Sequence, residues 1–179
     1  MRFAYADPPY KGCGKLYSSH HDEALIWNDE TTHHALAKRL VSEYPDGWAL
    51  SCNPRDLLMY LSVLPSDVRV AAWVKTWHQI RPTTVQYAWE PVIFRGGRKD
   101  NKRVPMVRDW LSANATRQRG LPGAKPDSFN RWILDLLNFE DGDTMDDLFP
   151  GTGGMGRVVN MPTFDLSSAV STFWDGEQE

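Results

Sequence analysis

Short apolar runs alternate with segments of helical periodicity along this chain, and that alternation limits the fold more than any other feature of the sequence. Residues 2–6 (RFAYA) are typical of a short buried strand, which Pro8 and Pro9 end because proline cannot donate to a sheet. Further strands are expected at 47–53, 68–77, 85–96 and the start of 144–159, and helices at 33–44, 55–65 and 128–139. The pattern predicts an α/β domain with a largely parallel sheet.

The 179 residues suit one domain, 1–179, with a sizeable core, since 41% are hydrophobic and 24% are charged. No stretch approaches the ~18 uninterrupted apolar residues of a membrane span, and the first residues do not resemble a signal peptide. Cys13 and Cys52 lack metal-ligand spacing and are expected to be reduced thiols in a cytoplasmic protein. The net charge of −3 indicates that any nucleic-acid surface is confined to part of the molecule.

Two stretches, 11–34 and 95–125, are expected to be largely loops. The first is polar and rich in glycine, serine and histidine. The second is basic, and its lysines and arginines are suited to phosphates; the candidates are Arg95, Arg98, Lys99, Lys102 and Arg103. A solvated loop without a ligand is the alternative for this second stretch.

The tetrapeptide Asp7-Pro8-Pro9-Tyr10 follows the first strand without a break. A carboxylate at Asp7 and the carbonyl of Pro8 can accept the two N–H bonds of an exocyclic amine, and charge-assisted bonds of this kind are strong. The prolines fix the backbone and so place the acceptors in advance. Tyr10 can stack on a base that has left its helix. The alternative is a plain turn with a packed tyrosine.

A second motif, Asp147-Leu148-Phe149-Pro150-Gly151-Thr152-Gly153-Gly154, lies where a strand is expected to lead into a helix. Glycines at such a turn allow the backbone to approach a ligand closely. No lysine follows at the spacing of a phosphate-binding loop, and the glycine spacing departs from that of dinucleotide-binding folds. Taken alone, the motif is a weak signal, and an ordinary loop is the alternative.

Together and in this order, the two motifs resemble those of S-adenosylmethionine (SAM)-dependent amino-methyltransferases that act on nucleic-acid bases. The order is that of the circularly permuted beta group of DNA amino-methyltransferases and of the mRNA adenosine methyltransferases. Trp73-Val74-Lys75-Thr76 and Trp89-Glu90-Pro91-Val92 resemble the middle strands of the second family, and Lys125-Pro126 resembles its Lys-Pro element. The resemblance implies a Rossmann-like methyltransferase fold, circularly permuted and abbreviated at its C-terminal side.

The resemblance also implies roles for particular residues. Catalysis falls to Asp7, Pro8, Pro9 and Tyr10. SAM is the implied cofactor, and the residues expected to bind it are Asp7, Lys125, Asp147, Phe149, Gly151, Gly153 and Asp165, where Arg157 and Asn160 are rivals of the last. The resemblance further implies that 11–34 and 95–125 are mobile substrate-binding loops, and Tyr17 and His20 are candidates for contacts with the target base. No metal is expected, because the adjacent histidine pairs at 20–21 and 33–34 lack supporting ligands.

The implied activity is methylation of the N6 amino group of adenine in DNA, since enzymes acting on cytosine N4 more often begin the tetrapeptide with serine. RNA adenine, cytosine N4, a catalytically inactive nucleic-acid-binding subunit and a small nucleotide-binding protein are the alternatives. With little recognition surface, either a short target sequence or a homodimer sharing DNA contacts is expected. No membrane partner is expected, and the small size fits an enzyme of a bacterium or a phage-infected cell.

Overall fold

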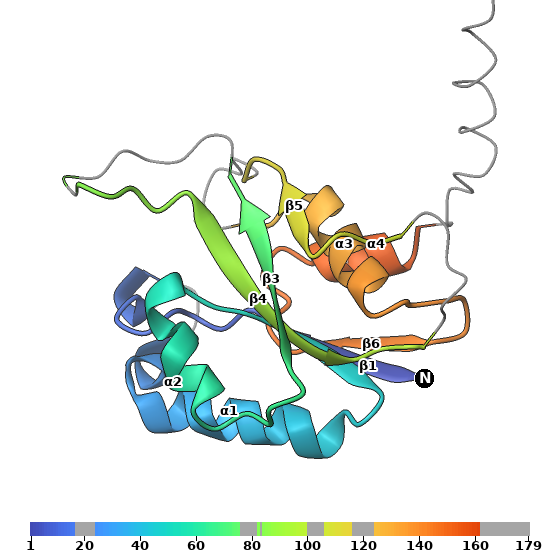
Figure 1. Cartoon of the computed structure of the whole chain (residues 1–179), viewed down its shortest axis with the longest axis horizontal. Coiled ribbons are helices and arrows are strands. Elements are labelled where there is room, and N and C mark those ends of the chain that lie inside the picture. Colours follow the sequence, from blue (N-terminus) through green and yellow to red (C-terminus); the bar gives the residue numbers. More distant parts are fainter. Residues whose placement is uncertain (17–23, 76–81, 83, 100–105, 116–123, 162–179) are drawn as a thin grey trace, which may run out of the picture.

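The structure, a computed structural model, describes residues 1–16, 24–75, 82, 84–99, 106–115 and 124–161. A six-stranded sheet in the order β5-β3-β4-β2-β1-β6 lies at its centre (Figure 1). The strands are β1 (Arg2–Ala6), β2 (Gly47–Ser51), β3 (Arg69–Val74), β4 (Trp89–Gly96), β5 (Trp110–Ser112) and β6 (Thr144–Asp147).

All strands except β4 run in one direction. Strand β1 pairs in parallel with both β2 and β6, and β3 pairs in parallel with β5. Strand β4 is antiparallel to its neighbours β2 and β3. The carboxyl ends of β1, β2 and β6 therefore meet at one edge of the sheet, and β4 begins at that same edge.

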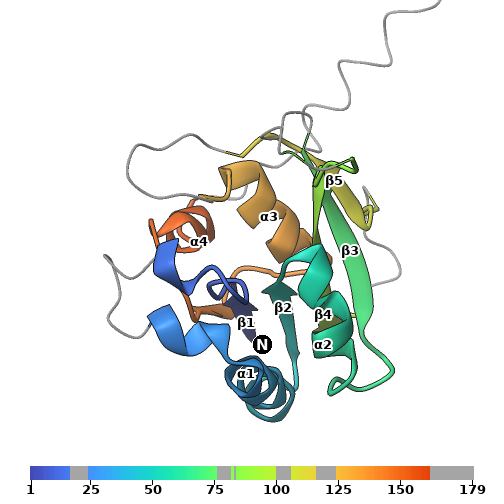
Figure 2. The same ribbon diagram turned by 90° about the vertical axis from the view of Figure 1, so that its left-hand side faces the viewer.

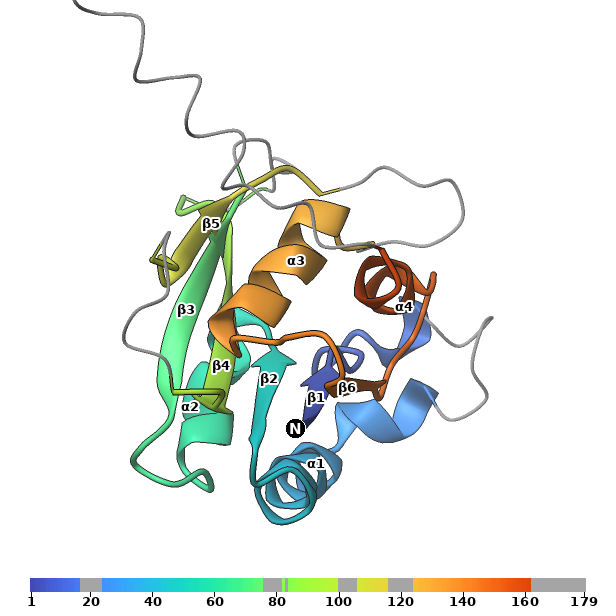
Figure 3. The same cartoon turned by 90° about the vertical axis from the view of Figure 1, so that its right-hand side faces the viewer.

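Helices cover both faces of the sheet. Helices α1 (Glu30–Glu43) and α2 (Leu57–Leu61) lie on one face, and α3 (Asp127–Leu136) and α4 (Gly154–Val159) lie on the other (Figures 2 and 3). Short 3-10 helices η1 (Gly14–Leu16), η2 (Ala24–Asn28) and η3 (Pro54–Asp56) complete the described elements. None of the described helices is long and apolar enough to cross a membrane.

The strands separate two apolar clusters because successive side chains point to opposite faces. Phe3 and Tyr5 of β1 pack with Phe129 and Ile133 of α3 in the first cluster. Ala4 and Ala6 of the same strand belong to the second cluster, with Leu36 and Leu40 of α1. Strand β1, buried on both faces, is thus held at the centre of the molecule.

The largely parallel α/β architecture predicted from the sequence is confirmed. Some boundaries differ: helix α1 begins at Glu30 because the Asp29 side chain accepts a hydrogen bond of 3.0 Å from the Thr31 amide and caps it. The expected loop 11–34 is therefore only partly a loop, since it contains η1, η2 and the first turn of α1. The expected loop 95–125 likewise contains the end of β4 and all of β5.

Candidate active site

A cavity of about 370 Å³ lies where β1 and β6 end. Parallel pairing places Tyr5 of β1 opposite Asp147 of β6, so the segments that follow the two strands leave the sheet side by side. The cavity is lined by eight residues proposed from the sequence, namely Asp7, Pro8, Pro9, Tyr10, Lys125, Asp147, Phe149 and Gly151. Gly153 is not among the lining residues and instead caps α4. The structure thus brings the two motifs, separated by about 140 residues of sequence, to one cavity.

Lys125 joins the tetrapeptide to the middle of the sheet. Its ammonium lies 3.1 Å from the Asp7 carboxylate and 3.2 Å from that of Glu90. It also donates a hydrogen bond of 3.2 Å to the Tyr10 hydroxyl, and only 9% of the lysine side chain is exposed. The sequence predicted a contact of Lys125 with the cofactor, and the described contacts link Lys125 to Asp7, Tyr10 and Glu90.

Glu90, at the start of β4, was not identified from the sequence as a site residue. Its carboxylate accepts a hydrogen bond of 2.7 Å from the Tyr10 hydroxyl and forms ion pairs with Lys75 and Lys125. Antiparallel pairing of β3 with β4 brings Lys75 and Glu90 together at the cavity edge. A charged residue inside the apolar run WEPVIF was the available signal, because a buried charge requires partners.

The two carboxylates that share Lys125 differ in acidity. Burial raises the pKa of Asp7, and the nearby Lys125 only partly opposes that effect. Burial would also raise the pKa of Glu90, but Lys125 and Lys75 outweigh it and lower the pKa to about 2. Burial lowers the pKa of Lys125, but Asp7 and Glu90 reverse the effect and raise it well above its usual value. At neutral pH, Glu90 is therefore an anion and Lys125 a cation.

The turn after β6 lines the cavity together with the tetrapeptide. Gly151 and Gly153 have φ angles of 47° and 72°, a region that side-chain-bearing residues rarely adopt. Asp147 accepts a hydrogen bond of 3.2 Å from the Phe149 amide, and within the described part of the chain it forms no ion pair. Burial raises the pKa of Asp147. Asp147 is thus a half-buried carboxyl group at the cavity, suited to a hydroxyl or amine of a ligand.

One wall of the cavity comes from η2, inside the segment expected to be a loop. The Trp27 ring packs edge-on against Phe149, with centroids 5.0 Å apart. His33 on α1 holds this wall, because its Nε2 donates to the Trp27 carbonyl at 2.7 Å while Nδ1 lies 2.5 Å from the Tyr60 hydroxyl. Burial lowers the pKa of His33, in keeping with a neutral ring. His33, for which the sequence predicted no metal role, therefore holds one wall of the cavity in place through its two hydrogen bonds.

Asn130 of α3 also lines the cavity, although the sequence did not predict it as a site residue. Its side chain is 2% exposed and lies against Gly154, the first residue of α4. A Cβ at Gly154 would approach Asn130 Nδ2 to 2.7 Å. The absence of a side chain at Gly154 therefore lets α3 and α4 approach closely beside the cavity.

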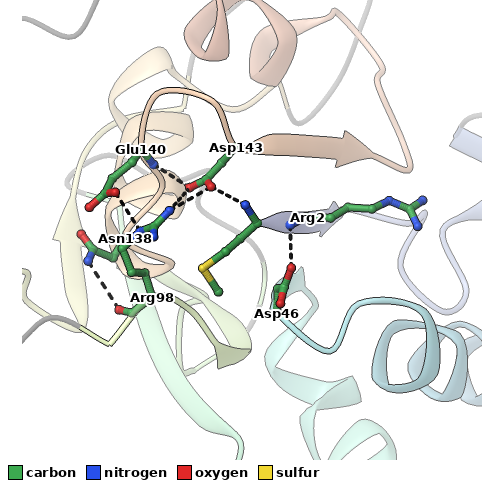
Figure 4. A network of polar contacts seen from close by, with 7 residues as sticks. Arg2, Asp46, Arg98, Asn138, Glu140 and Asp143 are labelled. Carbon is green, nitrogen blue, oxygen red and sulfur yellow. Dashed lines mark hydrogen bonds and ion pairs between the residues drawn. The ribbon is translucent and has the colours of Figure 1, made fainter.

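The basic candidates Arg95 and Arg98 lie at the other end of the sheet. Arg95 is five residues beyond Glu90 along β4, about 16 Å away at the usual rise per residue. It forms an ion pair of 2.8 Å with Asp67. Arg98 pairs with Asp143, which also binds the amino group of Met1 at the start of β1 (Figure 4).

The structure therefore does not bring Arg95 and Arg98 to the cavity, and both charges are compensated within the chain. Exposed Lys99 follows directly at the same end. A nucleic-acid role for these residues stays a prediction. The remaining candidates lie outside the described residues; they are Tyr17, His20, Lys102, Arg103 and Asp165.

The sheet, its two helical layers and the cavity beside the strand ends define a Rossmann-like methyltransferase fold. A solved structure similar to this chain is the crystal structure of the M1.HpyAVI–SAM complex, with a TM-score of 0.54 and 16% sequence identity. The match covers 88% of this chain and 76% of that one. Neither a protein-family profile nor a curated protein sequence matches this chain.

Proposed function

We propose that this protein is a SAM-dependent methyltransferase that transfers a methyl group to the N6 amino group of a flipped-out adenine in DNA. The observation that carries the proposal is the single cavity shared by Asp7–Tyr10 and the glycine turn after β6. The structural similarity to M1.HpyAVI, which was solved in complex with SAM, supports the fold and the cofactor in this proposal.

The donor side of the cavity fits SAM. A volume of about 370 Å³ is within the range of small-ligand pockets. Asp147 offers a carboxylate to the ligand's amine or hydroxyls, and the Trp27 and Phe149 rings offer an apolar wall. When bound, SAM supplies the methyl group on an electrophilic sulfonium.

The acceptor side is built from Asp7, Pro8 and Tyr10. Asp7 and the Pro8 carbonyl accept the two N–H bonds of the adenine amine, which turns the nitrogen lone pair towards the methyl group. Tyr10 stacks on the base, and its hydroxyl is held by Glu90 at 2.7 Å. Lys125 fixes Asp7 at 3.1 Å, so both the acceptor carboxylate and the stacking ring are positioned before the base arrives.

The test is methyl transfer from radiolabelled SAM to DNA that lacks methylation, followed by digestion to nucleosides. Label in N6-methyladenine is expected from the native protein and not from Asp7→Asn, which keeps the shape of the side chain but not its charge. Asp141→Asn, in the exposed turn before β6, is the matched control and should retain activity.

The other results of this assay separate the alternatives. Label in N4-methylcytosine, or only in RNA, would replace the proposed acceptor while retaining the reaction type. Absence of both label and S-adenosylhomocysteine binding, measured by calorimetry with DNA present, would identify an inactive subunit. The intact and preorganised Asp7–Tyr10 segment favours an active enzyme over that alternative.

A further inference from the structure

One face of the sheet carries exposed apolar side chains on β3, β4 and β5. Val74 of β3 lies opposite Trp89 of β4, and Ala72 of β3 lies opposite Trp110 of β5, so these side chains share a face. Val74, Trp89 and Trp110 are 36%, 39% and 47% exposed. We call Val70, Val74, Trp89 and Trp110 the aromatic face.

The described helices do not cover this face. Helix α2 lies on the same side of the sheet but beside β4, and no described helix lies over the outer side of β3 and β5 (Figure 2). Because monomeric proteins seldom expose neighbouring large apolar side chains without a use for them, two tryptophans on one open face indicate a binding surface.

Arginines border the aromatic face at two points. The Arg108 guanidinium lies over the Trp110 ring, 5.5 Å from its centroid. Arg55 stacks on Tyr87, two residues before Trp89, at 4.9 Å and donates to its hydroxyl at 2.8 Å. Within the described part of the chain, neither Arg55 nor Arg108 forms an ion pair.

Other arginines differ in this respect. Arg69, Arg95 and Arg98 are all paired with carboxylates. Arg55 and Arg108, which have no ion-pair partner among the described residues, therefore mark a locally cationic surface on a chain whose net charge is −3. A polyanion complements such a surface better than a second, equally acidic copy of the chain does.

The face leads directly to the candidate active site. Trp89 and Glu90 are consecutive, so the indole reaches the aromatic face while the carboxylate lines the cavity. Arg55 follows the carboxyl end of β2, at the same edge of the sheet as the cavity. Trp89 and Glu90 point to opposite faces of the sheet, so a strand bound on the aromatic face reaches the cavity by turning around this edge.

We infer that the aromatic face binds the nucleic-acid strand whose base enters the cavity, an inference that rests on the proposed function. Trp89 and Trp110 stack on bases, and Arg55 and Arg108 contact phosphates. The two indole-bearing backbone positions are two strand spacings and two residues apart, about 12 Å. This places nucleic-acid recognition on β3, β4 and β5 and not on Arg95 and Arg98.

The experiment measures fluorescence anisotropy of a short labelled DNA duplex with one mismatched adenine, titrated with the full-length protein at several salt concentrations. Trp110→Ala and Trp89→Ala are each expected to weaken binding at least fivefold, and Trp110→Phe less than Trp110→Ala. Arg108→Gln, which removes an exposed charge, should weaken binding and lower the salt dependence by about one phosphate contact. Arg39→Gln, on α1, is the matched control and should bind like the native protein.

Several results would overturn the inference. Native affinity in the aromatic-face variants, or loss of affinity only in Arg95→Gln and Arg98→Gln, would show that DNA is bound elsewhere. A native dimer that Trp110→Ala dissociates in light scattering would show that a second copy covers the face. S-adenosylhomocysteine calorimetry on the same variants should be unchanged, so failure of cofactor binding in the native protein would reject the proposed function separately.

Discussion

Replacing Glu90 with glutamine should destabilise the protein in a pH-dependent way. The carboxylate is 16% exposed and is bound by Lys75, Lys125 and the Tyr10 hydroxyl. Glutamine keeps the size and one hydrogen-bond acceptor but removes the negative charge. Lys75 then loses its carboxylate partner, and Lys125 retains one carboxylate partner, Asp7.

The size of the effect follows from the acidity of Glu90. Its pKa falls from 4.5 to about 2 on folding, and each tenfold change in an acid constant corresponds to about 1.4 kcal/mol. The ionised form is thus stabilised by about 3 kcal/mol, which agrees with the cost of about 3–5 kcal/mol for breaking a buried ion pair. We expect Glu90→Gln to lower the free energy of unfolding by about 3 kcal/mol at pH 7.

The sign of the pH dependence is fixed by the lowered pKa of Glu90. The unfolded state takes up a proton more readily than the folded state. The contribution of ionised Glu90 to the free energy of unfolding is therefore complete above pH 4.5 and is lost as the pH falls through about 2. The difference in the free energy of unfolding between the native protein and Glu90→Gln should therefore decrease to about 2 kcal/mol at pH 3.5.

Urea denaturation followed by far-UV circular dichroism at pH 7 and pH 3.5 measures both values. Glu43→Gln is the matched control, since the Arg39–Glu43 pair on α1 is exposed and should contribute about 0.5 kcal/mol or less. A loss below about 1 kcal/mol at pH 7, or a loss that does not diminish in acid, would refute the role of Glu90 as the charged centre of this network.

Three further perturbations test the cavity walls. Asp147→Asn should weaken S-adenosylhomocysteine binding at least about tenfold in calorimetry, since hydrogen bonds to charged groups contribute about 1.5–3 kcal/mol. Equal affinity of the variant and the native protein would show that Asp147 does not bind the cofactor. Gly154→Ala places a Cβ 2.7 Å from Asn130 Nδ2 and should cost about 1–3 kcal/mol in urea unfolding, whereas Gly156→Ala, with nothing within 4 Å, should not destabilise. His33→Phe leaves the Trp27 carbonyl without its donor and should cost about 1–3 kcal/mol at pH 7. Because burial lowers the pKa of His33, the native protein should also lose stability as the pH falls below 6.5, and a variant that loses it equally would contradict the assignment.

The local features of the candidate site were open to prediction from sequence because short-range chemistry determines them. Pro8 and Pro9 end β1 through their ring geometry, and Gly151 and Gly153 adopt left-handed backbone angles that favour glycine. Alternating apolar runs were sufficient to predict an α/β sheet, since burial of each strand requires helices to cover it.

Strand pairing determined the features of the candidate site that the sequence did not predict. The reversed direction of β4 brings Glu90 to the cavity and carries Arg95 to the opposite edge, and nothing in the local sequence specifies that direction. Lys75 contacts Glu90 because β3 pairs with β4, and Lys125 contacts it because α3, which begins two residues later, packs on the sheet. A run of charges in a sequence gives the sign of a surface, but the sheet register determines whether those charges reach a ligand or one another.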